Sequence, residues 1–491
     1  MDQFPALLIV IPLFAAPLVA MLPNNRLPWM LATAVSWVVL AIAVTVFIRV
    51  LDAGTISYAL GGWEPPWGIE LRLDVLNVLI VLIVAGIGAV VMPFAGPSAA
   101  TELEPRNTAL FFCLFLLTYT GLLGIVVTGD IFNMFVFLEI SSLSSYALIA
   151  LGRDRRALTA AYQYLIMGTI GATFFLIGVG LLYSLTGTLN IADMAARLPA
   201  VNGTRTEQTA FAFIVAGIGL KLALFPVHLW LPNAYTYAPS VVSAFIAATA
   251  TKVAVYVMLR VLYTVFGADY SFGVMPLTPI LIALSVVGIV ATSSLAVIQD
   301  DAKRLLAYSS VAQIGYMVVG LAFATQAGLT AAITHVFNHA LMKGALFLAL
   351  GAVAYRIGST RISEFEGLGR AMPWTMSAFA IGGLSLIGVP LTAGFISKWY
   401  LILAALQEGW WWLAVIVLLT SLIAVIYVWR IVEAAWFRPA PAHRAELREA
   451  PLSLLVPVWI LTLANIWFGV DTRFSVGVAA RAAEMLLGAA P

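Results

Sequence analysis

The sequence predicts an all-α polytopic membrane protein with 14 transmembrane helices. Of the 491 residues, 62% are hydrophobic and only 10% are charged, whereas a soluble domain carries about 25% charged residues. The apolar residues form runs of about 20, which is the length that crosses a bilayer as a helix. These runs also lack the period-2 alternation of a membrane β-barrel. A soluble multidomain enzyme is therefore excluded.

Turn and charge clusters separate the expected helices along the chain. The first run lacks a preceding basic region and a cleavage site, so we expect a span and not a removed signal peptide. The tail 471–491 is too short to span and is expected to form a weakly amphipathic end. Glycines in the sixth helix are expected to allow close packing: Gly168, Gly171, Gly178 and Gly180. The expected helices lie near residues 5–22, 28–50, 73–92, 107–127, 131–151, 159–185, 209–231, 238–266, 277–298, 304–324, 329–355, 373–405, 412–436 and 452–469.

The seventh and twelfth helices are expected to be discontinuous. In the seventh, Lys221 precedes Pro226, and in the twelfth, Lys398 follows Pro390. Proline removes a backbone donor and clashes with the preceding turn, and a pair of interrupted helices indicates an ion site in transporters built from repeats. Taken singly, each proline is equally consistent with a packing kink.

The basic residues of the loops predict the orientation of the chain. The positive-inside rule places the side with more Lys and Arg in the cytoplasm. Thirteen basic residues fall on one side and five on the other, which predicts that both termini lie outside. The larger set is Arg26, Arg106, Arg153, Arg155, Arg156, Lys303, Arg304, Arg356, Arg361, Arg370, Arg438, Arg444 and Arg448; the smaller is Arg72, Arg197, Arg205, Arg473 and Arg481.

A few charged residues lie near the middle of predicted helices. The chain has 20 Arg but only five Lys, and four of the lysines fall inside apolar stretches. Lys303 is the exception and is expected to be a cytoplasmic anchor beside Arg304. The residues expected near mid-bilayer depth are Glu139, Lys221, Lys252, Lys398 and, at i, i+4 and i+8 on one helical face, His335, His339 and Lys343.

These charges indicate a proton path. Four lysines and one glutamate facing lipid would cost more than about 12 kcal/mol, so they must face one another or water. One carboxylate can pin two helices by pairing with one lysine, but it cannot neutralise four. Burial favours the neutral form of lysine, and such a side chain can carry a proton near neutral pH. Arginine does not deprotonate in proteins, and the split of Arg to loops and Lys to helices fits proton transfer.

Metal and cofactor sites are not expected. His335 and His339 have the spacing of two zinc or haem ligands, but only His228 remains as another buried histidine and the chain has a single cysteine, Cys113. Imidazoles titrate near neutrality, so both histidines fit a proton relay better. No phosphate-binding loop or basic run for nucleic acid is present.

Several stretches together resemble one family. They are the run from Gly129 to Ile140 that contains Glu139, the run from Lys221 to Thr236, the run from Ala238 to Tyr256 that contains Lys252, and the run from Asp301 to Ser310. They resemble the proton-translocating, antiporter-like membrane subunits of Mrp-type cation/proton antiporters, membrane-bound hydrogenases and respiratory complex I. The resemblance covers roughly residues 70–435. The Gly-Asp-Ile-Phe-Asn run from Gly129 and the lysine at 398 are most similar to the Mrp D subunit and its hydrogenase relatives.

The resemblance implies an internal symmetry and a role for each charged residue. It implies two inverted five-helix repeats, helices 4–8 and 9–13, so that the chain divides into 1–106, 107–266, 277–437 and 438–491. Glu139 and Lys221 are then the paired residues of the fifth and seventh helices, and Lys252 is the connecting lysine of the eighth. His335, His339 and Lys343 are polar residues of the eleventh helix, and Lys398 closes the path. The chain is expected to lack the lateral helix and extra domain of the largest family member.

We expect an ion-transport subunit without enzyme activity or cofactor. It would lie in the prokaryotic inner membrane with other subunits of an Mrp-like or complex I-like assembly, and would move protons in exchange for Na⁺ or K⁺. Three alternatives stay open: a proton-pumping subunit of a redox complex, a haem- or quinone-binding electron carrier, and a structural membrane subunit. The lysines at mid-bilayer depth are the main objection to the last.

Overall fold

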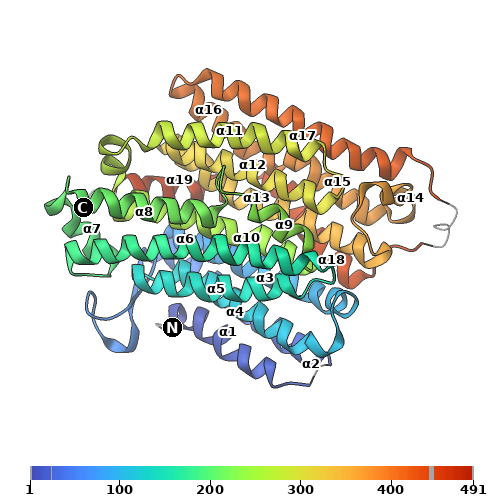
Figure 1. Cartoon of the computed structure of the whole chain (residues 1–491), viewed down its shortest axis with the longest axis horizontal. Helices are drawn as coiled ribbons and strands as arrows, with labels where there is room; N and C mark the ends of the chain where they lie inside the picture. The colour runs from blue at the N-terminus through green and yellow to red at the C-terminus, as the bar shows by residue number, and fades with distance from the viewer. Residues whose placement is uncertain (1–2, 24, 442–446, 489–491) are drawn as a thin grey trace.

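The computed structural model describes residues 3–23, 25–441 and 447–488, which fold mostly into helices (Figure 1). Eleven helical segments of this described part are long and apolar enough to cross a membrane. They are α2 (Leu27–Ala53), α3 (Val75–Glu102), α4 (Thr108–Val127, preceded by η2, Pro105–Asn107), α5 (Ile131–Ala150), α6 (Arg156–Thr186), α10 (Ser240–Leu259, continued by η4, Arg260–Val265), α11 (Leu277–Val297), α12 (Ala302–Ala322), α13 (Gln326–Ile357), α17 (Trp411–Phe437) and α18 (Leu452–Val470).

The other three expected spans are shorter or divided. The first is α1 (Phe4–Ala20), a helix of 17 residues. The seventh is α8 (Arg205–Leu222) followed by α9 (Trp230–Tyr237), and the twelfth is α15 (Pro373–Ile387) followed by α16 (Ala393–Gln407). Pro226 and Pro390 lie in the non-helical stretches between these pairs. The structure therefore divides both helices where the prolines are.

Short elements occupy the connections. A small antiparallel sheet pairs β1 (Ile56–Ala59) with β2 (Glu70–Leu73), in a register that sets Ile56 opposite Leu73. The all-helical prediction missed this hairpin because its four-residue strands lie in a loop, outside the long apolar runs. The remaining elements are η1 (Leu60–Gly62), α7 (Ile191–Arg197), η3 (Leu198–Val201), η5 (Asp269–Val274), η6 (Ile362–Phe365), α14 (Leu368–Ala371) and α19 (Arg473–Gly488).

Aspartate and threonine side chains set where several spans begin. Asp74 accepts hydrogen bonds from the N–H groups of Leu76 and Asn77 at the start of α3. Asp130, Asp301 and Thr325 act in the same way at the starts of α5, α12 and α13. These caps satisfy N–H groups that a helix leaves without a partner. The caps therefore fix where each apolar segment begins.

Three helices form the centre of the bundle. All of the apolar window of α12 and 94% of that of α10 are buried inside the protein, and α13 contacts both. Figure 1 shows these helices in the middle, with α2 and α17 towards the outside. Only 39% of the windows of α2, α6 and α17 is buried, so these helices have apolar faces free for lipid or partner subunits. Polar residues of α10 and α13 therefore lie in the protein interior.

The glycines of α6 bring it close to its neighbours. A methyl group at Gly171 would lie 2.9 Å from the Gly217 carbonyl on α8, and one at Gly178 would lie 2.3 Å from the Ile214 side chain. A methyl group at Gly168 would collide with the Tyr146 hydroxyl of α5. Close packing is therefore confirmed at these three glycines. It is wrong for Gly180, which has no neighbouring atom within 4 Å.

The basic loops of one predicted side meet at one end of the bundle. Arg153, Lys303 and Arg361 line a single hollow of about 390 Å³ there. Lys303, the expected cytoplasmic anchor, lies in the first turn of α12, is 5% exposed, and donates to the Ala238 carbonyl at 3.2 Å. Arg444 lies outside the described residues. The expected orientation in the membrane stays a prediction.

Candidate functional site

The first break in a helix holds a lysine beside a carboxylate. Lys221 lies in the last turn of α8, and its Nζ is 3.5 Å from Oε1 of Glu139 on α5. The Lys221 ammonium also donates to the Ser142 hydroxyl at 2.7 Å. The Lys221 side chain is only 8% exposed, whereas that of Glu139 is 25% exposed. The pair therefore joins two helices at the edge of the protein interior.

The backbone at this break finds partners inside the protein. Ala223 takes the left-handed conformation with φ of 58°, and the Leu224 N–H then donates to the Gly219 carbonyl at 2.9 Å. The Trp230 indole donates to the Leu220 carbonyl at 3.0 Å. Irregular backbone at membrane depth is tolerated where such groups are satisfied. His228 lies in the same segment and is buried.

Lys252 is fully buried on α10. Its ammonium donates to the Ala247 carbonyl at 2.5 Å and to the Thr251 hydroxyl at 3.4 Å. Between this region and Lys221 lies a cavity of about 30 Å³, whose lining includes Ser142, Thr251 and Lys221. A polar cavity of this size can hold a water molecule, which needs about 10–15 Å³. Lys221 therefore lines a space that can be hydrated, and Lys252 is linked to that space through the Thr251 hydroxyl.

The polar residues of α13 form a column at the centre of the bundle. The rings of His335 and His339 stack with centroids 5.8 Å apart and planes 8° apart. His335 Nδ1 lies 2.7 Å from the Ser397 hydroxyl on α16, whereas neither ring nitrogen of His339 has a partner. The Lys343 ammonium donates to the Leu306 carbonyl at 2.8 Å and to the Ser309 hydroxyl at 2.6 Å.

The second break holds the last lysine. Lys398 extends from α16 to the end of α15, where it donates to the carbonyls of Leu386 and Ile387 at 3.0 and 2.9 Å and to the Ser421 hydroxyl at 2.9 Å. A cation is stabilised by the free carbonyls at a helix C-terminus. Lys221 comes from the C-terminal turn of a half-helix, and Lys398 reaches back to one. Lys221 precedes its proline and Lys398 follows its proline, yet both ammonium groups lie at the C-terminal end of a half-helix.

Five of the predicted residues share one electrostatic environment. His339 interacts electrostatically with Lys252, Lys343, His335 and Lys398, and Lys343 interacts with Lys252. Among the described residues, no carboxylate pairs with Lys252, Lys343 or Lys398, whereas Glu139 pairs with Lys221. The described part also contains no group of three His, Cys, Asp or Glu residues placed to hold a metal ion. The group is therefore a set of lysine and histidine side chains whose hydrogen-bond partners are hydroxyls and carbonyls.

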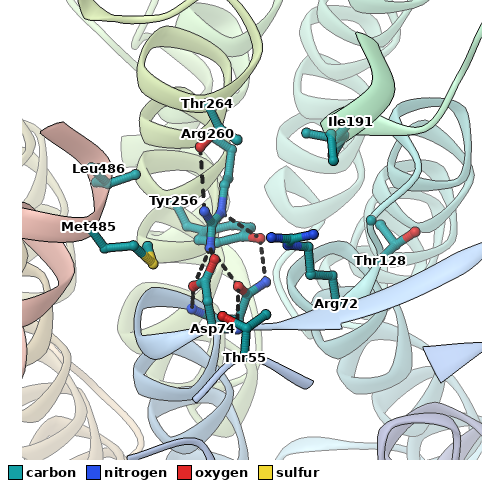
Figure 2. Close-up of a pocket in the computed structure, with 13 residues that line it drawn as sticks. Thr55, Arg72, Asp74, Thr128, Ile191, Tyr256, Arg260, Thr264, Met485 and Leu486 are labelled. Atoms are coloured by element: carbon teal, nitrogen blue, oxygen red, sulfur yellow. Dashed lines mark hydrogen bonds and ion pairs between the residues drawn. The ribbon is translucent and has the colours of Figure 1, made fainter. Parts of the chain in front are cut away.

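A second polar cluster lies beyond Lys252 along α10 and η4, around Tyr256 and Arg260. Figure 2 shows a pocket of about 150 Å³ in which Arg72 and Arg260 extend towards Tyr256, with Met485 and Leu486 of α19 on another side. Arg260 Nη2 contacts both carboxylate oxygens of Asp74 at 2.5 Å. Both side chains are 7% exposed. The cluster therefore contains a buried ion pair.

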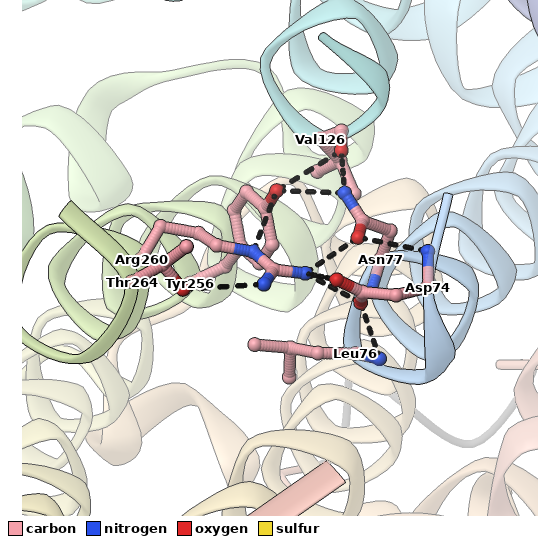
Figure 3. A network of polar contacts seen from close by, with 7 residues as sticks. All are labelled: Asp74, Leu76, Asn77, Val126, Tyr256, Arg260 and Thr264. Carbon is pink, nitrogen blue, oxygen red and sulfur yellow. Dashed lines mark hydrogen bonds and ion pairs between the residues drawn. The ribbon is translucent and has the colours of Figure 1, made fainter. Parts of the chain in front are cut away.

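Neutral groups complete this network (Figure 3). Arg260 also donates to the Asn77 amide oxygen at 2.5 Å and to the Tyr256 hydroxyl at 3.3 Å. The Tyr256 hydroxyl donates to the Val126 carbonyl at 3.1 Å and accepts from the Asn77 amide at 2.8 Å. Tyr256 follows Lys252 by one helical turn, but its hydroxyl is fully engaged with this network. The network ties α3, α4 and α10 together.

An acidic side chain near the same pocket is partly desolvated. Asp130, between α4 and α5, caps α5 through the Asn133 N–H at 2.6 Å. Burial raises the pKa of the Asp130 carboxyl, and the N–H groups of Asn133 and Phe132 oppose this effect. Its ionised form is therefore less favourable in the folded protein than in water.

Residues 128–424 match the family described as NADH:quinone oxidoreductase/Mrp antiporter, TM. The chain belongs to this family. It is 43% identical over 484 residues to a Desulforudis audaxviator protein named NADH-quinone oxidoreductase subunit N, and the alignment covers 95% of each chain. It is 31% identical to the D subunit of the Na(+)/H(+) antiporter of Bacillus subtilis, over 99% of this chain and 98% of the relative.

Two solved structures have the same fold. A chain of the membrane-bound sulfane sulfur reductase, an archaeal respiratory membrane complex, has a TM-score of 0.91 and 34% identity and covers 99% of this chain and 98% of its own. A chain of the Mrp complex from Dietzia sp. DQ12-45-1b has a TM-score of 0.90 and 27% identity at the same coverage. These relatives confirm the resemblance to antiporter-like subunits of membrane assemblies. This chain is therefore an integral membrane protein of that family.

The structure brings the predicted site residues of this family member into two groups. Glu139 and Lys221 form one, and Lys252, His335, His339, Lys343 and Lys398 form the other. The hydroxyls that bind them were missed, namely Ser142, Ser309, Ser397, Ser421 and Thr251. Serine is common in helices, and its sequence position does not indicate which lysine it faces.

The ion pair of Asp74 and Arg260 was also missed. The expected split of Arg to loops and Lys to helices is wrong at Arg260, which is buried in a membrane-spanning segment. A signal was available: Arg260 falls within the expected helix 238–266, and Asp74 lies at the start of another apolar run. Only the tertiary structure brings the two together across 186 residues.

Proposed function

We propose that this chain is the proton-translocating membrane subunit of a multi-subunit monovalent cation/H⁺ antiporter. The observation that carries the proposal is the ion pair of Lys221 with Glu139 at a break in a helix, followed by buried lysines that have no carboxylate partner in the described structure. Arranged in this way, the bases can hold and release protons where lipid excludes water. The driven ion would be Na⁺ or K⁺, exchanged by the whole assembly.

The proton path would run along the membrane plane. Glu139 stabilises the charged form of Lys221, and separating the two would favour release of the lysine proton. The cavity between Ser142 and Thr251 offers room for water to carry that proton towards Lys252. His339 and His335 would pass it to Lys398. Each break would give access to one side of the membrane.

We propose that the fold contains two similar halves in opposite orientation. We propose 14 crossings, in which α1, the α8–α9 pair and the α15–α16 pair join the eleven long spans. Residues 107–266 and 277–437 would form the inverted repeats, each with one divided helix and a lysine at its break. Both termini would lie outside. Other membrane subunits would cover the exposed faces.

A second candidate is a proton-pumping subunit of a redox complex. The 43% identity to a relative named NADH-quinone oxidoreductase subunit N favours it. So does the likeness to a chain of the sulfane sulfur reductase complex. The same proton path would then be driven by electron transfer in partner subunits. The chain itself would carry no redox centre.

The test uses the whole assembly, purified and placed in proteoliposomes. Glu139→Ala and Lys221→Ala should each abolish proton movement driven by the cation gradient or the electron donor, while the subunits still co-purify. Glu408→Ala is the matched control, because Glu408 is exposed at the end of α16. Unchanged proton movement in either site variant, with the complex intact, would contradict the proposal.

The composition of the co-purified assembly distinguishes the two candidate energy sources, a cation gradient and electron transfer. Small membrane subunits and proton movement driven by Na⁺ or K⁺ alone indicate the antiporter. Iron–sulfur subunits and proton movement that requires an electron donor indicate the redox complex. A haem band in the visible spectrum of the isolated chain would instead favour an electron carrier.

A further inference from the structure

A groove of about 610 Å³ runs along the outside of the first helix break. Its walls come from α6, from the segment between α8 and α9, from α9 itself and from α12. The volume lies within the range of about 300–1,000 Å³ that is typical of ligand sites. Its lining includes the apolar side chains of Ile166, Leu229 and Trp230.

The apolar part of this groove faces the bilayer. Leu229 is 67% exposed and Ile166 is 42% exposed. Ile166 belongs to the membrane-spanning helix α6, and Leu229 lies at the break of the proposed seventh crossing. The apolar window of α6 is only 39% buried by the protein. Lipid chains are therefore the natural surroundings of this wall.

One end of the groove is cationic. Arg304 lines it from the first turn of α12, and the Nε of its guanidinium is buried without a hydrogen-bond partner. Within the described structure, no carboxylate forms an ion pair with Arg304. The phenols of Tyr162 and Tyr308 line the same groove. A buried donor without a partner is costly, so this end is built for an acceptor.

The cationic and apolar ends of the groove lie at different depths, as the headgroup and acyl chain of a phospholipid do. Arg304 and Tyr162 lie near the starts of α12 and α6, at the end of the bundle where Lys303 and Arg153 meet. Leu229 and Pro226 lie further into the membrane, at the break. Basic pockets between transmembrane helices bind anionic lipid headgroups. A phosphate at Arg304 would leave an acyl chain against Leu229 and Ile166.

We propose that this groove binds one anionic phospholipid, with its phosphate on Arg304. The guanidinium and the phenols recognise the phosphate, and the apolar wall takes an acyl chain. Free inorganic phosphate would leave that wall empty, and a neutral membrane helix would leave Arg304 without an acceptor. The groove thus combines one cation with an apolar wall, as an anionic lipid combines phosphate with hydrocarbon.

The bound lipid would lie next to the Lys221 site. Trp230 lines both the groove and the small cavity beside Lys221, and its indole holds the Leu220 carbonyl. A lipid against Trp230 would therefore support the break from outside. This consequence rests on the proposed function, whereas lipid binding itself does not.

The first measurement is lipid content by mass spectrometry of the purified assembly. Wild type should retain about one anionic phospholipid per chain that Arg304→Gln loses. Arg370→Gln is the matched control, since Arg370 is exposed on α14 and away from the groove. Ile166→Trp fills the apolar wall and leaves Arg304 in place, so it should lose the lipid as well. This second variant keeps the test valid if Arg304→Gln does not fold.

The second measurement is binding of added lipid to delipidated assembly in detergent micelles. Phosphatidylglycerol should raise the Tm of wild type, and phosphatidylcholine or inorganic phosphate should not. Arg304→Gln should weaken the phosphatidylglycerol response by at least about tenfold in concentration, because a hydrogen bond to a charged group is lost. Equal lipid content in wild type and both groove variants would overturn the proposal. So would equal responses to both lipids, or cross-links from Leu229→Cys to a partner polypeptide that covers the groove.

Discussion

The buried pair of Asp74 and Arg260 offers a sharp test of how the bundle is held together. Removing one partner of a buried ion pair costs about 3–5 kcal/mol, because the other charge is left without compensation. In Asp74→Asn, the Asn77 amide and the Tyr256 hydroxyl still accept from Arg260. We therefore expect a loss near the lower limit, about 3 kcal/mol. Asparagine caps a helix as well as aspartate does, so the start of α3 is preserved.

Two further variants separate the charge from the cap. Asp74→Ala also removes the acceptor for the Leu76 and Asn77 N–H groups and should cost about 1 kcal/mol more. The double variant Asp74→Asn, Arg260→Met removes both charges and should lie within about 1 kcal/mol of wild type, since apolar replacement of a buried pair is often neutral.

The assay is unfolding in mixed micelles as the mole fraction of SDS rises, followed by circular dichroism. The expected order of stability is wild type, double variant, Asp74→Asn and Asp74→Ala. Equal stability of the double variant and Asp74→Asn would refute the reasoning, because the loss would then not come from an unpaired charge.

Three further predictions concern single positions. Lys343→Met should raise stability in the same assay, because a buried lysine without a carboxylate partner among the described residues is costly. The same change should reduce proton movement in proteoliposomes at least about tenfold. Retained transport would show that Lys343 is not part of the path. Gly178→Leu should destabilise the bundle, since even a methyl group there would lie 2.3 Å from Ile214. Gly180→Ala should instead stabilise the bundle by about 0.5–1 kcal/mol. Similar effects of the two changes would contradict the close packing of α6 at Gly178. Asp130→Asn keeps the cap and removes a carboxyl whose pKa is raised by burial. The wild-type carboxyl costs stability as pH rises through that raised pKa, so the gain in Tm from Asp130→Asn should be largest near pH 7 and shrink towards pH 4; a gain that does not change with pH would contradict the burial of this charge.

Much of the architecture follows from local sequence. A run of about 20 apolar residues has few alternatives to a membrane helix, because backbone groups must pair within the segment when water is absent. Proline at 226 and at 390 interrupts that pairing wherever it occurs, so the two divided helices were expected. Gly171 and Gly178 also indicated a close contact, because a glycine without a side chain lets a neighbouring helix approach. A glycine such as Gly180 carries the same signal on a lipid-facing side, and the sequence does not show which face is covered.

The sequence by itself also indicated the residues that we propose carry the chemistry. Lysine, glutamate and histidine are too costly in a bilayer to be there without partners or water, so Glu139, Lys221, Lys252, His339 and Lys398 could be named from composition and position. What each one contacts depends on folding. The tertiary structure decided that Glu139 pairs with Lys221 and that Lys398 reaches the carbonyls at the end of α15. It also placed Lys252 and Lys343 near His339, with no carboxylate partner among the described residues. It also decided the pair of Asp74 with Arg260. Such contacts join residues far apart in the chain, and their partners are set by how α3, α5, α10 and α13 pack, which no local pattern encodes.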